Sequence, residues 1–562
     1  MRIASVATAL ALLLSSSRAH TLPPRATSGP FLQELGNETW VIGNEIWNMT
    51  QGRQYGVQLF YRDHNCVGDA VGHYVSYNGA QSDLNWTAAS IEKEGTHNGA
   101  AYLDIKFTAR EGDMHWVIFS GLAGAYQYFV NRDLPVLGEF RTLWRLDNAT
   151  FTHGKTDLRD EALPPSATTD PRTRSRTRHG SSLTATADIS PSTTCRAGSG
   201  RSRITESMIH RESKTGDAVQ LNMIHGTHFQ VSAVDEFPEG KMWGPWLWYL
   251  NDGSREDAAQ RAVDEFAAWP YAWLEDEAYQ QRGSVRGQLQ LSDGRPAAHA
   301  AVFLGDNGGN KTALDMGSDY YYTAYADAEG RFEFRDVRAA TYGLQAWSNG
   351  SKIADVTTEY HHKDVVVTAG EMLNLETATW QVSDKTKIFQ VGDFDRTSYG
   401  FAHGGAPYEH GLVEKCPASL NFTVGVSQTE DWCFGQSKLG SWVISFSLDK
   451  SPAPCPKRRV DKPSKSREAT LIVSLAGYST GASSRVWAND VVIGNLTSGA
   501  APGLLNDPSL YRSGTTAGEW RYFEFPFDAG TILKKGLNEI RFEVTSNTTW
   551  RGFMWDSIVL EW

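Results

Sequence analysis

Two dense stretches of the chain carry the side chains best suited to proton transfer and anion binding. Residues 138–147 place Arg141 in an alternating aromatic and charged pattern, and residues 221–229 end in a histidine-rich turn that contains His228. A guanidinium fork matches the geometry of a carboxylate, and an imidazole exchanges protons near neutral pH. These residue types predict chemistry on an anionic substrate, with Arg141 and His228 as the candidate catalytic residues. A strand salt bridge for Arg141 and a structural hydrogen bond for His228 are the alternatives.

Aromatic side chains follow at Trp246, Trp248 and Tyr249. If they line a cleft, their flat faces can stack on sugar rings, and we interpret them as candidate substrate-binding residues. An alternating aromatic strand is also typical of a protein core, so this alternative stays open.

General catalytic motifs are absent from the sequence. It contains no Walker loop, no GxSxG and no HExxH, and its cysteines have no zinc-ligand spacing. Acidic residues are abundant, so spacing alone neither locates nor excludes a glycosidase carboxylate pair. No loop rich in Asp and Asn demands calcium, and we expect no cofactor and no metal.

Length and charge narrow the class of protein. The chain has 562 residues, a formal net charge of -12 and 11% aromatic residues. The length predicts several domains, and the negative charge argues against a nucleic-acid partner. No apolar run after the N-terminus is long enough to cross a bilayer, so no membrane partner is expected.

The N-terminus indicates the compartment. An apolar stretch follows Arg2, and small residues at the usual cleavage spacing predict a signal peptide over residues 1–19. Nine Asn-x-Ser/Thr sequons suit a secreted glycoprotein, although some must be chance matches; they start at Asn37, Asn48, Asn85, Asn148, Asn310, Asn349, Asn421, Asn495 and Asn547. Among the five cysteines, Cys416 and Cys433 could form one disulfide. We expect a secreted, extracellular monomer.

Periodicity predicts a mainly β chain. Residues 103–110 alternate apolar and polar side chains, and residues 486–493 have the pattern of a hairpin around Asn489 and Asp490. Residues 320–334 also resemble a hairpin, with its turn at 327–330. One helix is predicted, with Ser254 as its N-cap and Pro270 as its stop.

One segment departs from the rest of the chain. Residues 165–203 are rich in Arg, Ser and Thr, and no aromatic residue occurs between Phe151 and Phe229. A solvated linker or a basic arm would explain such a composition. A third hypothesis is translation in a shifted reading frame, from a mis-predicted intron or a sequencing error.

The longest motifs resemble the fungal rhamnogalacturonan lyases of polysaccharide lyase family 4, particularly those of the lyase B type. They are GNETWVIGN (36–44), VGHYVSYNGAQSDLNW (71–86), GEFRTLWRLD (138–147), GTHF (226–229), IFQVGDFDRT (388–397) and WDSI (555–558). The resemblance covers nearly the whole chain outside residues 165–203. It implies a catalytic β-sandwich over 20–282, a fibronectin-III-like domain over 283–379 and a jelly-roll, carbohydrate-binding-like domain over 380–562.

The resemblance also implies a reaction, β-elimination at galacturonate in the rhamnogalacturonan I backbone of pectin. Arg141 matches an active-site arginine of that family, and His228 is the candidate proton donor. The residue that corresponds to a catalytic histidine of better-studied members is Ser254, which already has a role as a helix N-cap. The family base is a lysine followed by an aromatic residue, yet this chain has no lysine between Lys155 and Lys214.

We therefore expect a secreted lyase that acts on rhamnogalacturonan I. Because the family lysine is missing, the alternative is an inactive lyase-like protein that binds the same polysaccharide. A glycoside hydrolase, which would leave a saturated product, is the third possibility.

Overall fold

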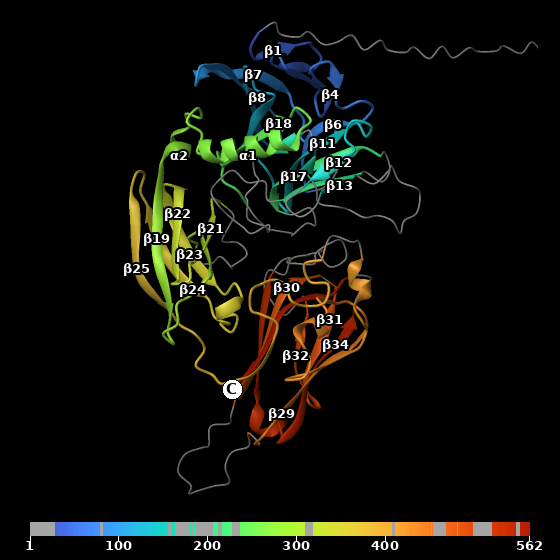
Figure 1. Ribbon diagram of the computed structural model, residues 1–562, viewed down its shortest axis with the longest axis vertical. Coiled ribbons are helices and arrows are strands. Elements are labelled where there is room, and N and C mark those ends of the chain that lie inside the picture. The colour runs from blue at the N-terminus through green and yellow to red at the C-terminus, as the bar shows by residue number, and fades with distance from the viewer. Residues whose placement is uncertain are drawn as a thin grey trace, which may run out of the picture.

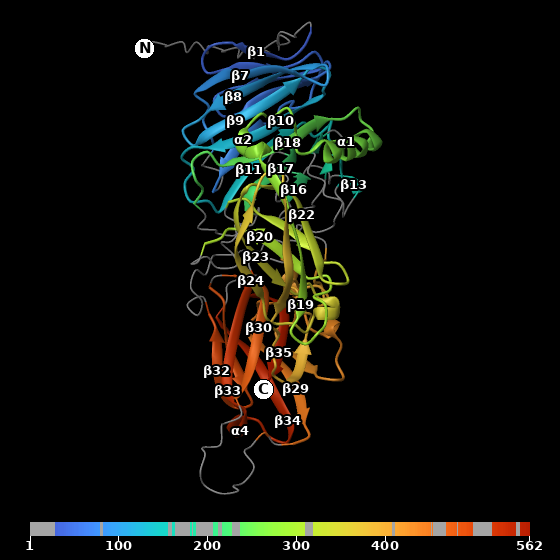
Figure 2. The same cartoon turned by 90° about the vertical axis from the view of Figure 1, so that its left-hand side faces the viewer.

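The computed structural model of the chain describes residues 28–78, 83–155, 160–162, 180–181, 184–186, 206–211, 216–226, 236–308, 319–406, 411–450, 452, 468–479, 481–497, 520–546 and 551–562. Within these residues the chain forms three β-sandwiches, which Figure 2 shows one after another along the long axis. The predicted mainly β fold is confirmed. The predicted signal peptide and most of residues 165–203 lie outside the described residues. In the described part of the chain, no helix is both long and apolar enough to span a bilayer.

The N-terminal sandwich consists of two large sheets that face each other (Figure 1). The strands of the first sheet, in spatial order, are β1 (Phe31–Glu34), β2 (Trp40–Gly43), β3 (Trp47–Gln51), β4 (Gly56–Tyr61), β6 (Gly72–Tyr77), β11 (Glu139–Leu146), β17 (Ala218–Gly226) and β16 (Glu206–Arg211), with β5 (His64–Asn65) beside β4. Those of the second sheet are β13 (Asp160–Ala162), β12 (His153–Lys155), β14 (Gly180–Ser181), β15 (Thr184–Thr186), β18 (Met242–Leu250), β10 (Gly124–Asn131), β9 (Gly112–Phe119), β8 (Ala100–Thr108) and β7 (Ala88–His97). The short strands β14 and β15 come from the segment of unusual composition.

Aromatic side chains fill the space between these two sheets. The indole of Trp144 on β11 stacks on that of Trp248 on β18, with ring centroids 4.8 Å apart and an interplanar angle of 14°. Trp47 and Trp116 contact the same Trp248 ring edge to face. Burying rings of this size is the largest single source of stability available to a sandwich core.

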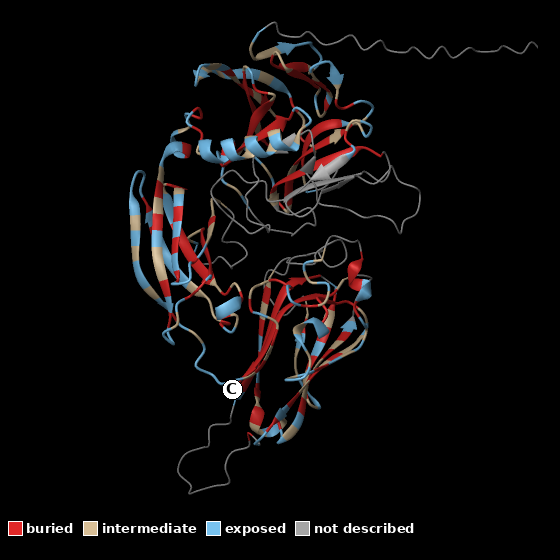
Figure 3. Ribbon diagram, viewed as in Figure 1, coloured by how far each residue is buried: buried red, intermediate tan, exposed pale blue. Residues whose placement is uncertain are grey.

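The second sheet is covered on its outer face by α1 (Arg255–Ala268), α2 (Glu277–Gln280) and the chain between them. The predicted N-cap is confirmed, because Ser254 Oγ accepts a hydrogen bond from the Asp257 N–H at 3.0 Å. The helix ends at Ala268, two residues before Pro270. Its outer side is largely exposed (Figure 3).

The middle sandwich packs a three-strand layer against a four-strand layer. The first layer consists of β22 (Arg331–Arg338), β19 (Arg282–Leu291) and β25 (Met372–Trp380), and the second of β21 (Tyr322–Tyr325), β20 (Ala301–Gly305), β23 (Ala340–Trp347) and β24 (Tyr360–Val367), with η3 (Ser351–Ile353) between β23 and β24.

The predicted hairpin of residues 320–334 is wrong, because β21 and β22 belong to different layers. The turn between them crosses the sandwich and meets β19, where the Leu289 N–H donates to the Gly330 carbonyl at 2.9 Å. Gly330 has φ +78°, and a Cβ there would lie 2.2 Å from the Leu289 carbonyl oxygen. The sequence predicts the turn at 327–330 correctly. However, contact with β19 makes β22 pair with β19 and not with β21.

The C-terminal sandwich again has two sheets. One contains β26 (Lys387–Val391), β35 (Phe553–Glu561), β30 (Glu468–Tyr478) and β33 (Arg521–Asp528), with β28 (Gly435–Gln436) beside β35. The other contains β27 (Leu420–Thr423), β29 (Gly440–Leu448), β34 (Gly536–Ser546), β31 (Ser483–Ala488) and β32 (Val491–Leu496). Short helical turns are η4 (Leu412–Lys415), η5 (Thr429–Asp431) and α4 (Ala529–Ile532). The predicted hairpin at residues 486–493 is confirmed by the β31–β32 pair.

Cations packed on aromatic rings join the N-terminal and middle sandwiches. The Lys241 side chain is 4% exposed, and its Nζ donates to the Asp319 carbonyl at 2.5 Å. The same Nζ lies 4.7 Å from the Phe237 ring centroid and 5.2 Å from that of Tyr320. A buried ammonium needs such partners, because desolvation alone would strongly disfavour its charge.

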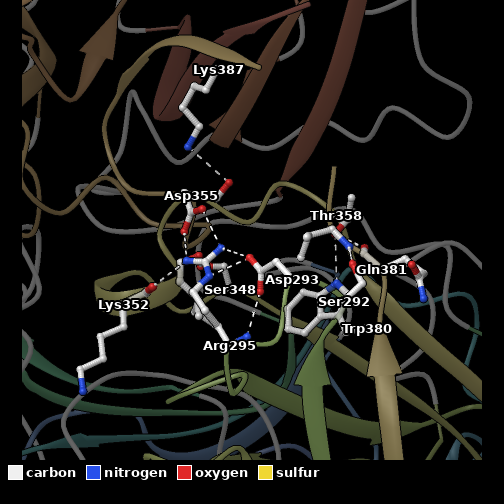
Figure 4. Close-up of polar contacts among 12 residues, drawn as sticks. Ser292, Asp293, Arg295, Ser348, Lys352, Asp355, Thr358, Trp380, Gln381 and Lys387 are labelled. Atoms are coloured by element: carbon white, nitrogen blue, oxygen red, sulfur yellow. Dashed lines mark hydrogen bonds and ion pairs between the residues drawn. The ribbon is translucent and has the colours of Figure 1, made fainter. Parts of the chain in front are cut away.

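A comparable contact joins the middle and C-terminal sandwiches. The Arg396 guanidinium lies 4.0 Å from the ring centroids of both Trp347 and Trp520, and it forms an ion pair with Glu359. Nearby, Arg295 holds Asp355 through two hydrogen bonds of 2.8 Å (Figure 4). The Asp355 carbonyl in turn accepts from Lys387 of the C-terminal sandwich at 3.4 Å.

The predicted disulfide between Cys416 and Cys433 is present in the C-terminal sandwich. It closes a loop with a sequence separation of 17 residues, for which removal of the crosslink costs about 3 kcal/mol. We expect the double variant Cys416→Ala, Cys433→Ala to unfold at lower temperature in calorimetry. Wild-type protein in reductant is the matched control and should show the same shift; an unchanged midpoint in both samples would contradict the crosslink's contribution.

Candidate functional site

The alternation of β11 divides its side chains between two environments. Phe140 and Trp144 point into the sandwich core, so Glu139, Arg141 and Arg145 lie on the opposite, outer face of the first sheet. The two arginine side chains are only 11% and 21% exposed. We call this outer face of β6, β11 and β17 the arginine face.

Apolar side chains from these strands surround the arginines. They are Tyr74 on β6, Leu143 on β11, and Val219, Leu221 and Met223 on β17, with Tyr55 packed against them. An apolar surround lowers the local dielectric and strengthens any charge interaction made there.

Arg141 is held by its own strand and by the neighbouring strand. Its Nε donates to Ser76 Oγ at 2.8 Å, and the backbone register places these two residues directly opposite each other. Its Nη1 lies 3.2 Å from Glu139 Oε1. Because a guanidinium carries five N–H groups, these two contacts fix its plane and still leave N–H groups for a ligand. A ligand carboxylate would share Arg141 with Glu139.

Arg145 repeats this arrangement four residues along β11. Its Nε donates to the Tyr74 hydroxyl at 3.3 Å, and its Nη1 lies 3.8 Å from Asp217 Oδ2. The arginine face thus presents two positioned guanidinium groups, which favour an anionic ligand.

A carboxyl group with a perturbed pKa lies beside these arginines. Burial raises the pKa of Asp83 above its usual 3.8, although the hydrogen bond from Tyr55 and the charges of Arg141 and Arg145 each lower it. The Tyr55 hydroxyl donates to Asp83 Oδ2 at 3.0 Å, while Oδ1 is buried and has no hydrogen-bond partner among the described residues. Asp83 is a group that can accept or release a proton within the field of both arginines.

The remaining candidate residues lie outside the described residues or have another role. His228, the candidate proton donor, lies outside the described residues. So do Lys214 and the side chain of Lys155, neither of which the sequence assigns a catalytic role. Ser254 is occupied as the helix cap. His225 is partly buried, and its ring packs edge to face on Phe237 at 4.8 Å between centroids.

The predicted substrate-binding role of Trp246, Trp248 and Tyr249 is wrong for this structure. The first two are 1% exposed and belong to the core between the sheets; Tyr249 is 8% exposed and packs under α1. Trp246 donates its indole N–H to Gln127, and the Tyr249 hydroxyl donates to Asp257. β18 is covered on both faces, so none of these rings is available to stack on a sugar.

Sequence reasoning missed Tyr55, Asp83 and Arg145. Asp83 lies inside the 71–86 motif, but nothing in its spacing indicates that it meets Tyr55 from the end of the β3–β4 turn. Only the isolated bridge between Ser76 and Asp83 brings it beside Arg141. Within the described residues, no group of three or more His, Cys, Asp or Glu side chains is arranged to hold a metal ion.

Comparison with family models identifies the two C-terminal sandwiches. Residues 292–375 match polysaccharide lyase family 4, domain II, and residues 387–560 match domain III of the same family, whose model is named CBM-like. These two matches agree with the middle and C-terminal sandwiches seen in the structure.

The individual relatives are named as rhamnogalacturonate lyases or as probable ones. A rhamnogalacturonate lyase of Dickeya dadantii is 30% identical over 358 residues, which are 61% of this chain and 56% of that protein. Two proteins named "Probable rhamnogalacturonate lyase B" are also similar. The one from Aspergillus flavus is 26% identical over 36% of this chain and 33% of its own length. The one from Aspergillus niger is 23% identical over 48% of this chain and 42% of its own length. The chain thus spans about half, or less, of the curated relatives it matches.

Likeness to solved structures is weak. The full-length major pilin SpaD of Corynebacterium diphtheriae is 11% identical, over 48% of this chain and 57% of the pilin, with a TM-score of 0.16. This likeness carries no argument about function.

The core position of Trp248 gives the first prediction for this sandwich. Trp248→Ala should destabilise it by about 3–5 kcal/mol, because the cavity removes the contacts of a fully buried ring. Thermal unfolding measures this, with Val263→Ala, at a side chain that is 62% exposed on α1, as the control. A Trp248→Ala protein of wild-type stability that had lost only polysaccharide binding would restore the cleft interpretation.

Asp83 gives a second prediction, on pH. Its pKa is raised in the folded protein, so it favours folding most below the unfolded pKa near 3.8, and this contribution is lost as the pH rises through the folded pKa. Asp83→Asn does not titrate, so relative to wild type the variant should gain unfolding free energy as the pH rises from 4 to 7. Denaturant unfolding at both pH values tests this, with the exposed Asp69→Asn as control. A difference between Asp83→Asn and wild type that is independent of pH would contradict the burial of a titrating group.

Proposed function

We propose that the protein is a secreted polysaccharide lyase that cleaves the rhamnose–galacturonate bond of rhamnogalacturonan I by β-elimination. The observation that carries this proposal is the 358-residue similarity to a rhamnogalacturonate lyase, combined with the held guanidinium of Arg141 on the arginine face. The matches to domains II and III of polysaccharide lyase family 4 add support. The apolar N-terminus, the sequons and the disulfide suit secretion.

The reaction needs three groups. A base removes the C5 proton of galacturonate, the electron pair forms the C4–C5 double bond, and the bond from C4 to the glycosidic oxygen breaks. The departing oxygen takes a proton, and a 4,5-unsaturated galacturonate remains at the new non-reducing end. Because the C5 proton is only weakly acidic, a cation must stabilise the charge that develops on the neighbouring carboxylate.

Arg141 suits that electrostatic role. Its guanidinium is planar, permanently charged and held at Nε and Nη1, so it is oriented before a substrate arrives. Arg145 adds a second positive group on the same face. In this proposal His228 supplies the proton to the departing oxygen.

The base is open to two assignments in this proposal. Asp83 is the described group whose position and raised pKa suit proton abstraction beside Arg141. The other candidate base is a lysine whose side chain lies outside the described residues, such as Lys214. The chain has no lysine between Lys155 and Lys214, the region where the resemblance places the family base.

That gap favours a second candidate function, a lyase-like protein that binds rhamnogalacturonan I without cutting it. The two functions differ in one measurement, the ultraviolet absorbance of the unsaturated uronate formed from rhamnogalacturonan I. A rise in absorbance supports the lyase. Binding of the polysaccharide without any rise supports the second function, and sequencing of the transcript then shows whether residues 165–203 are encoded as written.

Substitution of Arg141 tests its role directly. Arg141→Gln should lower kcat/KM by about 100-fold or more, mainly through kcat, because it removes charge that matters most in the transition state. Arg141→Lys keeps the charge without the fork, so its loss should be smaller. Arg53→Gln, at a side chain that is 58% exposed on the same sandwich, is the matched control. Wild-type kcat in a folded Arg141→Gln variant would remove Arg141 from the mechanism.

A further inference from the structure

An indole side chain on one sheet of the C-terminal sandwich contacts the neighbouring strand. Trp487 on β31 is directly opposite Arg541 on β34, and its Nε1 donates to Glu543 Oε2 at 3.0 Å. Glu543 is two residues further along β34, so this bond directs the indole N–H towards the neighbouring strand. Figure 1 shows β31 and β34 on the side of this sandwich away from the middle one.

Arg541 supports one face of this ring. Its guanidinium carbon lies 4.4 Å from the Trp487 centroid, and its Nε is buried without a hydrogen-bond partner among the described residues. A buried guanidinium nitrogen in contact with an indole face is the geometry of a cation–π pair. The ring therefore rests on Arg541 and is anchored at its N–H.

Part of the Trp487 side chain is accessible. Trp487 is partly exposed although its neighbours Val486 and Ala488 are buried, because only the odd positions of β31 face outward. Arg485, the next outward residue, is exposed, and its guanidinium carbon lies 5.7 Å from the same centroid. On the other side, Val492 of β32 is opposite Trp487 and is 43% exposed.

We propose that Trp487, Arg485 and Arg541 form a binding platform for a hexuronate unit of an acidic polysaccharide. The pyranose ring stacks on the free face of the indole, and the exposed Arg485 guanidinium pairs with the uronate carboxylate. The positive charge of Arg541 under the indole also attracts the negatively charged uronate. This inference rests on the proposed function only for the source of the uronate, the galacturonate of the same polysaccharide.

The charges around the platform are consistent with this ligand. Glu543 accepts a hydrogen bond from the indole N–H, and it lies opposite Arg485 in the register of the two strands. A ligand carboxylate can therefore replace Glu543 as the anion next to Arg485. Glu539 is the further acidic residue on the same face of β34. Asn421 and Asn495 lie on the edge strands β27 and β32 of this sheet, each in a sequon. Asn495 is directly opposite Arg485, so a glycan there would compete with a ligand for the space beside this guanidinium, and the binding test therefore removes glycans first.

The test measures binding of the full chain to polygalacturonate and to neutral galactan by affinity electrophoresis, after endoglycosidase treatment. Trp487→Ala should weaken retention by polygalacturonate by about tenfold, and Arg485→Gln should weaken it less. Val426→Ala, at an exposed side chain of the same sandwich, is the control. Thermal unfolding confirms that each variant folds, and Trp487→Phe, which keeps a flat ring, should retain most of the binding.

The outcomes separate this proposal from the proposed function. Unchanged retention of a folded Trp487→Ala variant overturns the platform, whether or not the protein is a lyase. An equal loss on galactan overturns the assignment of a uronate. Loss confined to polygalacturonate supports the platform even if no unsaturated product forms.

Discussion

The stacked indoles of Trp144 and Trp248 are the contact on which the arginine face depends. They join β11 to β18 across the core, with 4.8 Å between ring centroids. A strand's side chains alternate with a period of two, so this contact also decides which residues of β11 face outward. A shift by one residue would bring Arg141 into the core and expose Trp144. Trp248, which the sequence suggests as a sugar-stacking residue, therefore helps to position the Arg141 guanidinium on the opposite face of the first sheet.

Several arginine and lysine side chains pack on aromatic rings in this protein. How far each pair is enclosed by protein separates those that join two sandwiches from the one that could bind a ligand. Arg396, whose side chain is 14% exposed, lies between two indoles, and the buried Lys241 lies among three rings, each at a contact between sandwiches. These pairs hold neighbouring sandwiches together, since separating them would leave apolar rings exposed. Arg541 has the same chemistry but meets the ring of Trp487 from one side only, and that ring remains partly exposed. An exposed ring face is what a ligand can use.

The arginine face combines positive charge with an apolar surround, and that combination explains its pKa pattern. Burial raises the pKa of Asp83, while both arginines oppose the shift. A uronate that enters would meet the same two arginines and would compete with Asp83 and Glu139 for them. Binding of such a carboxylate and the protonation of Asp83 are therefore linked. In the proposed elimination, this linkage holds whichever group removes the C5 proton.

Local patterns in the sequence were enough to predict the mainly β class, the capped helix at Ser254 and the 486–493 hairpin, whereas the Cys416–Cys433 disulfide was only one possible pairing until the structure showed it. The class, the helix and the hairpin are each decided by residues that are close in sequence or by a strong local preference. Arg141 was predicted from its motif, but its partners Ser76, Asp83 and Tyr55 meet it only through strand pairing. Asp104 shows the same limit, because it alternates like a solvent-facing residue on β8 but is buried and bonds His115 at 2.8 Å. The alternation of residues in the sequence shows that a strand has two faces, but only tertiary packing decides which face is covered. In β18 both faces are covered.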